Sequence, residues 1–154
     1  MKLNFLIFAV AIIPSGGFAQ PVRWQDYVVP ETGAVAQIPT TIFSEDGGKP
    51  EIGYGKRFIT SDRRANLTVQ SVSNDAGDSP AAFLAKRNPP PNIEYRRVTS
   101  RFFAVSSVRN NKTWYNRCNF VGHFVNCVII NYPAAEERQW DSVVTRISNT
   151  LTKR

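Results

Sequence analysis

One stretch, YNRCNFVGHFVNCVIINYP at residues 115–133, constrains the fold most strongly, because two β-rich runs flank a Gly-His pair. Glycine at the first central position suits a type II′ turn, which joins two antiparallel strands through only two residues. We therefore expect a hairpin whose strands cover 113–121 and 124–132, with Gly122 and His123 at its turn. This register determines which side chains lie opposite one another.

Both cysteines and the single histidine of the chain fall in this hairpin, which raises the question of a metal or catalytic site. The register places Cys118 directly opposite Cys127, on a non-hydrogen-bonded pair where Cα atoms approach to about 4.5 Å. A disulfide tolerates that separation, so we predict an inward-pointing Cys118–Cys127 disulfide, worth about 2–3 kcal/mol for so short a loop. Two cysteines and one histidine are one ligand short of a closed zinc site. We expect His123 to be a solvated turn residue, and we predict neither a metal site nor a Cys–His nucleophile.

The first twenty residues have the layout of a secretory signal peptide. A basic start precedes an apolar run over 5–13, and small residues lead to a predicted cleavage between Ala19 and Gln20. A membrane anchor is the alternative, but this run is far shorter than the about 20 residues that a spanning helix needs. We therefore expect a signal peptide over 1–19 and a single α+β domain over 20–154. The mature chain, without a membrane span, would be periplasmic or secreted.

The charge balance narrows the class of partner. Removal of the signal peptide would leave 18 of the 19 basic side chains against 12 acidic ones, a net charge of +6. An exported protein rarely meets nucleic acid, so we expect no nucleic-acid partner. Anionic lipid head groups, acidic polysaccharides or an acidic envelope protein fit better. The alternative is that the charge only keeps the protein soluble, since the basic residues are scattered along the chain.

Short β-rich runs between glycines and prolines predict antiparallel strands. Outside the hairpin they cover 23–29, 33–39, 51–60, 65–73 and 94–109, the last bent or split near Ser100, with a loop over 40–50. Within 65–73 the apolar side chains Leu67 and Val69 alternate with polar ones at Thr68 and Gln70. This alternation is typical of a half-buried strand with one polar face.

Two segments have the pattern of helices. Ser79 can cap a short helix that begins at Pro80 and is ended by the proline-rich segment NPPPN, 88–92. Residues 134–151 carry an apolar stripe at helical spacing, formed by Trp140, Val143, Val144, Ile147 and Leu151. We expect this stripe to dock on the strands, whose apolar face needs a cover. The predicted class is α+β: an antiparallel sheet of about six strands packed against a C-terminal helix and one shorter helix.

No constellation in the sequence indicates catalysis. The acids are dispersed, and there is neither a nucleophile elbow nor a phosphate-binding glycine loop. The segment NDAGD, 74–78, has carboxylates but lacks the spacing and terminal glutamate of a calcium-binding EF-hand loop. We therefore predict no enzyme activity, no catalytic residue, no metal and no cofactor. A hydrolase whose site assembles from distant carboxylates remains an alternative.

The stretch RFFAVSSVRNNKTWYNRC, 101–118, is followed by NYP and by a helix pattern that ends in VVTRISNTL. This ordering resembles small exported bacterial proteins of the PsbP-like/DcrB-like kind, over most of 24–151. The resemblance implies an α+β fold and a non-enzymatic role in the cell envelope, and it carries no catalytic residues. Our main hypothesis is an exported binding or accessory protein. A cationic module that docks on anionic lipid or polysaccharide surfaces is the alternative.

Overall fold

The structure, a computed structural model, describes residues 21–153. Its elements in chain order are β1 (Trp24–Val28), β2 (Ala34–Pro39), β3 (Glu45–Gly48), β4 (Tyr54–Ile59), β5 (Asn66–Ser73), α1 (Pro80–Lys86), β6 (Asn92–Val98), β7 (Phe102–Arg109), β8 (Lys112–Val121), β9 (Phe124–Pro133), a 3₁₀ turn (Ala134–Glu136), α2 (Glu137–Thr150) and β10 (Thr152–Lys153). The predicted signal peptide and its cleavage site at Ala19 and Gln20 lie outside the described residues. None of the helices within 21–153 is long and apolar enough to cross a membrane.

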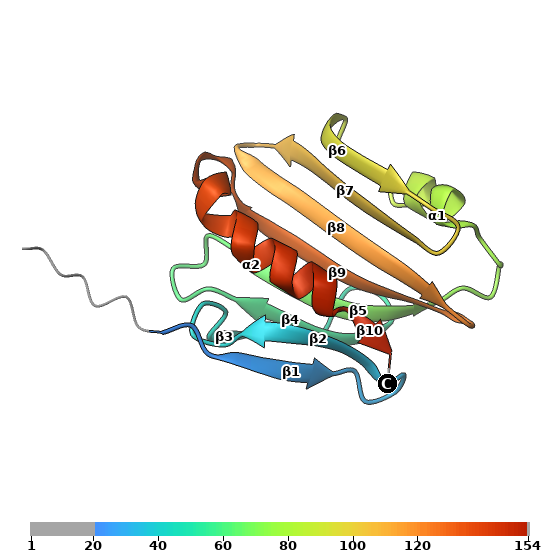
Figure 1. Ribbon diagram of the computed structural model, residues 1–154, viewed down its shortest axis with the longest axis horizontal. Coiled ribbons are helices and arrows are strands. Elements are labelled where there is room, and N and C mark those ends of the chain that lie inside the picture. The colour runs from blue at the N-terminus through green and yellow to red at the C-terminus, as the bar shows by residue number, and fades with distance from the viewer. Residues whose placement is uncertain (1–20, 154) are drawn as a thin grey trace, which may run out of the picture.

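The strands form two antiparallel sheets (Figure 1). The main sheet has seven strands in the order β3-β4-β5-β9-β8-β7-β6, and the small sheet has the order β1-β2-β10. The predicted α+β class, with an antiparallel sheet, a C-terminal helix and one shorter helix, is confirmed. The main sheet has seven strands where about six were expected in a single sheet, and β1 and β2 belong to the separate small sheet.

Two local features account for the extra strands. The run 94–109 is split, as the sequence indicated near Ser100, because a turn closed by Thr99 N–H on the carbonyl of Phe102 separates β6 from β7. The expected loop over 40–50 instead contains β3, whose sequence EDGG has no apolar residue. Backbone pairing with β4 and an ion pair between Asp46 and Lys56 hold this strand, and neither produces an apolar pattern that could reveal it from the sequence.

Helix α2 covers one face of the main sheet, alongside the small sheet (Figure 1). Its predicted apolar stripe is buried, with Trp140, Val143, Val144 and Ile147 in the helix and Leu151 just beyond it. The stripe packs on side chains of β5 and β9 that point to this face, among them Leu67 and Ile130. The helix starts later than predicted, at Glu137, because Ala134–Glu136 form the 3₁₀ turn.

Helix α1 lies on the opposite face, which we call the α1 face. Its N-cap is Ser79, whose side chain accepts a hydrogen bond from the backbone N–H of Ala82. Phe83 and Leu84 of the helix pack on a second apolar cluster that includes Phe103 of β7. Because successive strand residues point to opposite faces, this cluster uses the alternate positions of the same strands that support α2.

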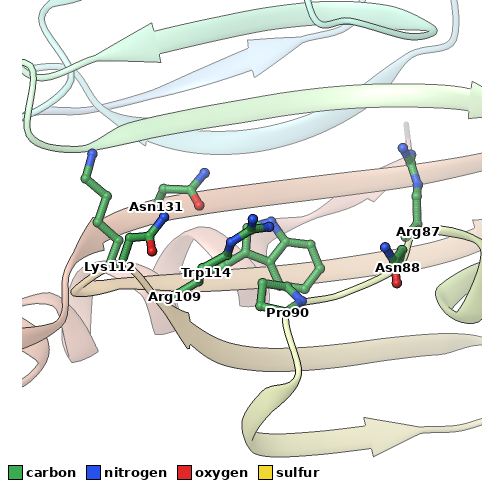
Figure 2. A pocket seen from close by; sticks show the side chains of 8 residues that line it. Arg87, Asn88, Pro90, Arg109, Lys112, Trp114 and Asn131 are labelled. Carbon is green, nitrogen blue, oxygen red and sulfur yellow. The ribbon is translucent and has the colours of Figure 1, made fainter.

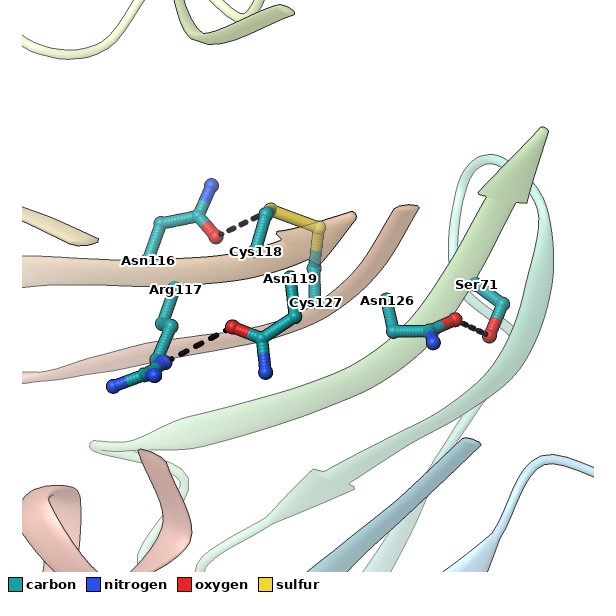
Figure 3. The surroundings of a disulfide bond; sticks show 7 residues. All are labelled: Ser71, Asn116, Arg117, Cys118, Asn119, Asn126 and Cys127. Carbon is teal, nitrogen blue, oxygen red and sulfur yellow. Dashed lines mark hydrogen bonds between the residues drawn. A yellow bond between two sulfur atoms is a disulfide. The ribbon is translucent and has the colours of Figure 1, made fainter. Parts of the chain in front are cut away.

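The disulfide, whose bond between Cys118 and Cys127 is drawn in Figure 3, belongs to this second cluster. Cys118 and Cys127 are directly opposite in the β8–β9 register, are bonded to each other, and have Cα atoms 4.1 Å apart. Both side chains are fully buried. Gly122 has φ +60° at the turn and His123 is exposed, which matches the expected type II′ hairpin. The pair therefore joins two central strands inside the core and offers no thiol for chemistry.

Candidate anion-binding groove

Two adjoining hollows lie on the α1 face, between β4 and the segment that connects α1 to β6. Their volumes are about 360 and 260 Å³, and Arg87, Trp114 and Asn131 line both of them. A cavity of this size is at the lower end of the range used for small ligands. We call the two hollows together the Trp114 groove. Figure 2 shows Trp114 in its middle, with Lys112 and Asn131 on one side and Arg87 on the other.

The floor of the groove consists of polar side chains from the central strands. In the cross-strand register, Asn66 of β5 lies opposite Asn131 of β9, which lies opposite Trp114 of β8. The side-chain amide of Asn131 donates to Oδ1 of Asn66 at 3.1 Å. A side-chain amide donates through its NH₂ group and accepts through its oxygen, so this pair leaves the Nδ2 donor of Asn66 and the Oδ1 acceptor of Asn131 available.

The polar face of β5 is more buried than the sequence pattern indicated. Thr68 and Gln70, expected on the solvated face of a half-buried strand, are only 8% and 3% exposed. Both line the groove, so this face is recessed below the surface. The alternating pattern identified the two faces of the strand correctly, but it could not show that a distant segment would cross the polar one.

The charged side chains that line the groove are almost all cationic. They are Arg57, Arg87, Arg109 and Lys112, and the exposed Glu51 carries the only carboxylate among the described lining residues. Ion pairs within 21–153 involve other cations: Lys56, Arg63, Arg64 and Lys86. Within 21–153 none of the four groove cations forms an ion pair, so the groove has a positive potential that Glu51 offsets only in part.

Arg87 is the most constrained of these cations. It is the C-cap residue of α1, and its guanidinium carbon lies 5.0 Å from the ring centroid of Phe83. Its Nε and Nη2 are buried and have no hydrogen-bond partner among the described residues. Burial lowers the pKa of Arg87, yet a guanidinium stays charged at neutral pH. A partly desolvated charge without an acid is costly to the fold and is satisfied best by an anion.

Further polar atoms without partners lie on the same face. Gln70 Nε2, Asn116 Nδ2 and Ser107 Oγ are buried and have no hydrogen-bond partner within the described chain. Oδ1 of Asn116 lies 3.3 Å from Sγ of Cys118, but a disulfide sulfur has no proton to donate (Figure 3). Each unpaired buried group costs about 1–3 kcal/mol. Two further atoms without a partner among the described residues, Thr113 Oγ1 and Asn126 Nδ2, lie on the α2 face, so the larger share, that of Arg87 included, is on the face with the cationic hollow. A local excess of unpaired polar groups beside a hollow is typical of a binding site.

The candidate residues identified from the sequence do not line the groove. The disulfide lies in the core beside Asn116, and His123 lies at the exposed hairpin turn. In the 74–78 loop, the carboxylate of Asp78 accepts hydrogen bonds from Lys86 Nζ. Within residues 21–153 no group of three or more His, Cys, Asp or Glu side chains has the geometry to hold a metal ion.

Sequence reasoning missed Arg87, Gln70 and Asn116. The available signal was weak: an arginine directly before the proline-rich segment 88–92, and strands that each had one polar face. Which polar face becomes a recess depends on where the 88–92 segment crosses the sheet. That is a long-range property with no local signature.

A second basic hollow, of about 270 Å³, lies on the α2 face. There the guanidinium carbons of Arg97 and Arg117 lie 5.3 and 4.5 Å from the ring centroid of Phe102. Arg117 also donates from Nε to Asn119 Oδ1. Because both guanidinium groups stack on the partly exposed ring of Phe102, on the face opposite the groove, they provide a natural comparison for Arg87.

The fold and the groove together define an α+β protein with helices on both faces of one antiparallel sheet and a cationic recess on the α1 face. The fold is PsbP-like: the chain is similar to cyanobacterial PsbP (CyanoP) from Synechocystis, with a TM-score of 0.60 over 93% of this chain and 99% of that chain. This confirms the PsbP-like layout expected from the sequence. At 11% identity the likeness concerns the fold alone. No protein-family model and no curated protein matches the chain.

Proposed function

We propose that this chain is an exported, non-enzymatic binding protein of the cell envelope, and that the Trp114 groove holds an anionic ligand. The proposal rests chiefly on Arg87, a half-buried guanidinium that, among the described residues, has two nitrogens without a hydrogen-bond partner and forms no ion pair. The three other groove cations reinforce its field. An anion would satisfy these donors with charge-assisted hydrogen bonds, which are stronger than neutral ones.

The hydrolase alternative finds little support in the acids of the described chain. Hydrogen bonds lower the pKa of two carboxylates, that of Asp62 chiefly from Thr60 and that of Asp46 chiefly from Lys56. Neither carboxylate lines the Trp114 groove. A general acid needs a raised pKa in a cleft, and these shifts have the opposite sign.

The test is calorimetric titration of the mature protein with small polyanions: citrate, triglutamate and trigalacturonate. We expect at least one to bind, and we expect Arg87→Met to weaken that binding by about tenfold or more. Arg97→Met is the matched control, because it removes the same charge from the opposite face and should change affinity by less than about twofold.

Two results would contradict the proposal. Absence of binding to all three polyanions at low salt would show that the groove does not accept anions. Equal losses in the Arg87→Met and Arg97→Met variants would show that binding depends on total charge, as expected for a cationic module docking on anionic surfaces.

A further inference from the structure

We infer that the ligand of the Trp114 groove is an acidic saccharide, a short chain of sugar residues that carry carboxylate groups. This inference rests on the proposed anion-binding function and specifies its ligand class. It is derived from three properties of the groove that a simple anion would not need: an aromatic platform, a row of side-chain amides and cations on both sides of the platform.

The platform is the indole of Trp114. Its side chain is partly exposed and lines both hollows, so one ligand can extend over it from one hollow to the other. The face of an aromatic ring is electron-rich and attracts the weakly positive C–H groups on the flat side of a sugar ring. Citrate or phosphate has no such apolar face and would gain nothing from this contact.

The amides supply the hydrogen bonds that sugar hydroxyls require. A hydroxyl group both donates and accepts, and neighbouring hydroxyls on a sugar ring do so side by side. The Asn66–Asn131 pair offers a donor and an acceptor next to Trp114, and the unpartnered Nε2 of Gln70 lines the same floor. Only 3% of the surface of Gln70 is exposed, so its amide is held in place before a ligand binds.

The cations are distributed along the groove and not gathered at one point. Figure 2 places Lys112 on one side of Trp114 and Arg87 on the other, and Arg57 lines the second hollow. A single anionic group could engage one end only. A chain with a carboxylate on successive residues would meet a cation on each side of the aromatic platform.

The wall of the groove is stiff. Asn88 and Pro90 line it within the proline-rich connection, and Asn88 has a left-handed backbone with φ +48°. Proline-rich segments are extended and semi-rigid, so the wall loses little conformational entropy when a ligand binds.

Other occupants fit less well. An acidic peptide that pairs as an added strand needs a free strand edge, but the floor strands β5, β9 and β8 are each paired on both sides. A lipid acyl chain needs an apolar trough. The described floor of the groove is not such a trough, because the side chains around Trp114 and Ile129 carry amides and hydroxyls. The saccharide is the class that uses the polar floor and the aromatic ring together.

The experiment compares three probes of matched length on the mature protein by calorimetry: trigalacturonate, its methyl-esterified neutral form and triglutamate. We expect trigalacturonate to bind about tenfold or more tightly than either of the other two, since only it offers both sugar rings and carboxylates. Trp114→Phe keeps an aromatic ring packed against the second apolar cluster but reduces its exposed face, so it should weaken trigalacturonate binding several-fold. Trp24→Leu, in the small sheet, is the control and should leave it unchanged.

The outcomes separate the inference from the function on which it rests. If triglutamate binds as tightly as trigalacturonate in an Arg87-dependent way, the groove is an anion site and the saccharide inference is wrong. If Trp114→Phe leaves trigalacturonate affinity unchanged while circular dichroism shows a folded protein, the platform argument is wrong. If neither these probes nor citrate binds, both the inference and the proposed function fail, and if citrate alone binds, the saccharide inference is wrong.

Discussion

At the scale of single residues, Arg87 illustrates a conflict between folding and binding. Its buried Nε and Nη2 have no hydrogen-bond partner in the described chain, which costs about 1–3 kcal/mol, whereas its contact with the ring of Phe83 contributes only about 0.5–1 kcal/mol. The unfavourable effect is the larger of the two. The free protein therefore carries this residue at a net loss of stability, as is common for binding-site groups.

We therefore predict that Arg87→Met stabilises the ligand-free protein by about 1 kcal/mol, since methionine keeps an apolar stem against Phe83 without a buried charge. Urea unfolding followed by circular dichroism measures the change. The Lys86→Met variant is the neighbouring control, because Lys86 is mostly exposed and forms an ion pair with Asp78. A clear loss of stability in Arg87→Met alone would mean that Arg87 supports the fold and is not reserved for a ligand.

Tyr132 gives a prediction for alkaline pH. Burial, reinforced by Glu137 and Asp141, raises the pKa of Tyr132 from 10.0 to about 12. Because the unfolded chain ionises first, stability is fully present below pH 10 and is lost as pH rises toward 12. The loss from this residue amounts to about 2–3 kcal/mol. Unfolding free energies measured between these pH values should show it, and Tyr132→Phe should remove most of it; an unchanged pH dependence in that variant would contradict the assignment.

At the scale of elements, the approach of β4 to β5 depends on Gly55. Its φ is +135°, and a Cβ at this position would overlap the carbonyl oxygen of Val69 on the neighbouring strand. A substitution here therefore has to separate two hydrogen-bonded strands. Gly77 also has a positive φ, of +64°, but its Cβ would meet nothing within 4 Å.

We predict that Gly55→Ala lowers the free energy of unfolding by about 3–5 kcal/mol, because it adds a steric overlap to backbone strain. Gly77→Ala carries the strain alone and should lower it by only about 1–2 kcal/mol. Thermal and urea unfolding of the two variants measure the difference. Similar values for both would show that β4 can move away from β5 at little cost.

The elements also show what could be predicted from the sequence. The Cys118–Cys127 pairing followed from a two-residue turn with glycine at its first position, because turn type determines register. The burial of α2 followed from the spacing of Trp140 and its partners. Neither β3 nor β10 could be predicted, since each is held by backbone pairing at a sheet edge. The groove was equally hidden, because it forms only where the 88–92 segment crosses the polar positions of distant strands.

At the scale of the whole molecule, the two faces of the main sheet have different roles. The α2 face is covered by the helix stripe and the small sheet, and it contains the larger apolar cluster. The α1 face is covered by a helix of only seven residues and leaves the Trp114 groove beside it. One face therefore supplies most of the stability, and the other leaves room for a ligand.

Signal-peptide cleavage and the disulfide can be tested together on the same exported protein. Protein recovered from the periplasm or medium should have the intact mass of a chain that begins at Gln20, after cleavage between Ala19 and Gln20. Thiol labelling without reduction should add no mass, because Cys118 and Cys127 are joined. Protein that starts at Met1 would contradict the predicted cleavage, and two labelled thiols in exported protein would contradict the disulfide.

The small sheet has a practical consequence for how the molecule can be attached to something else. Both ends of the described chain lie there, since β1 and β10 flank β2 on its two sides (Figure 1). Because β2 packs with α2 on the face of the main sheet that is remote from the groove, a linker, tag or immobilising surface joined at either end would leave the groove facing outward. The attachment points and the groove therefore lie on opposite sides of the protein, so a biosensor with controlled orientation could be attached through either end of the described chain.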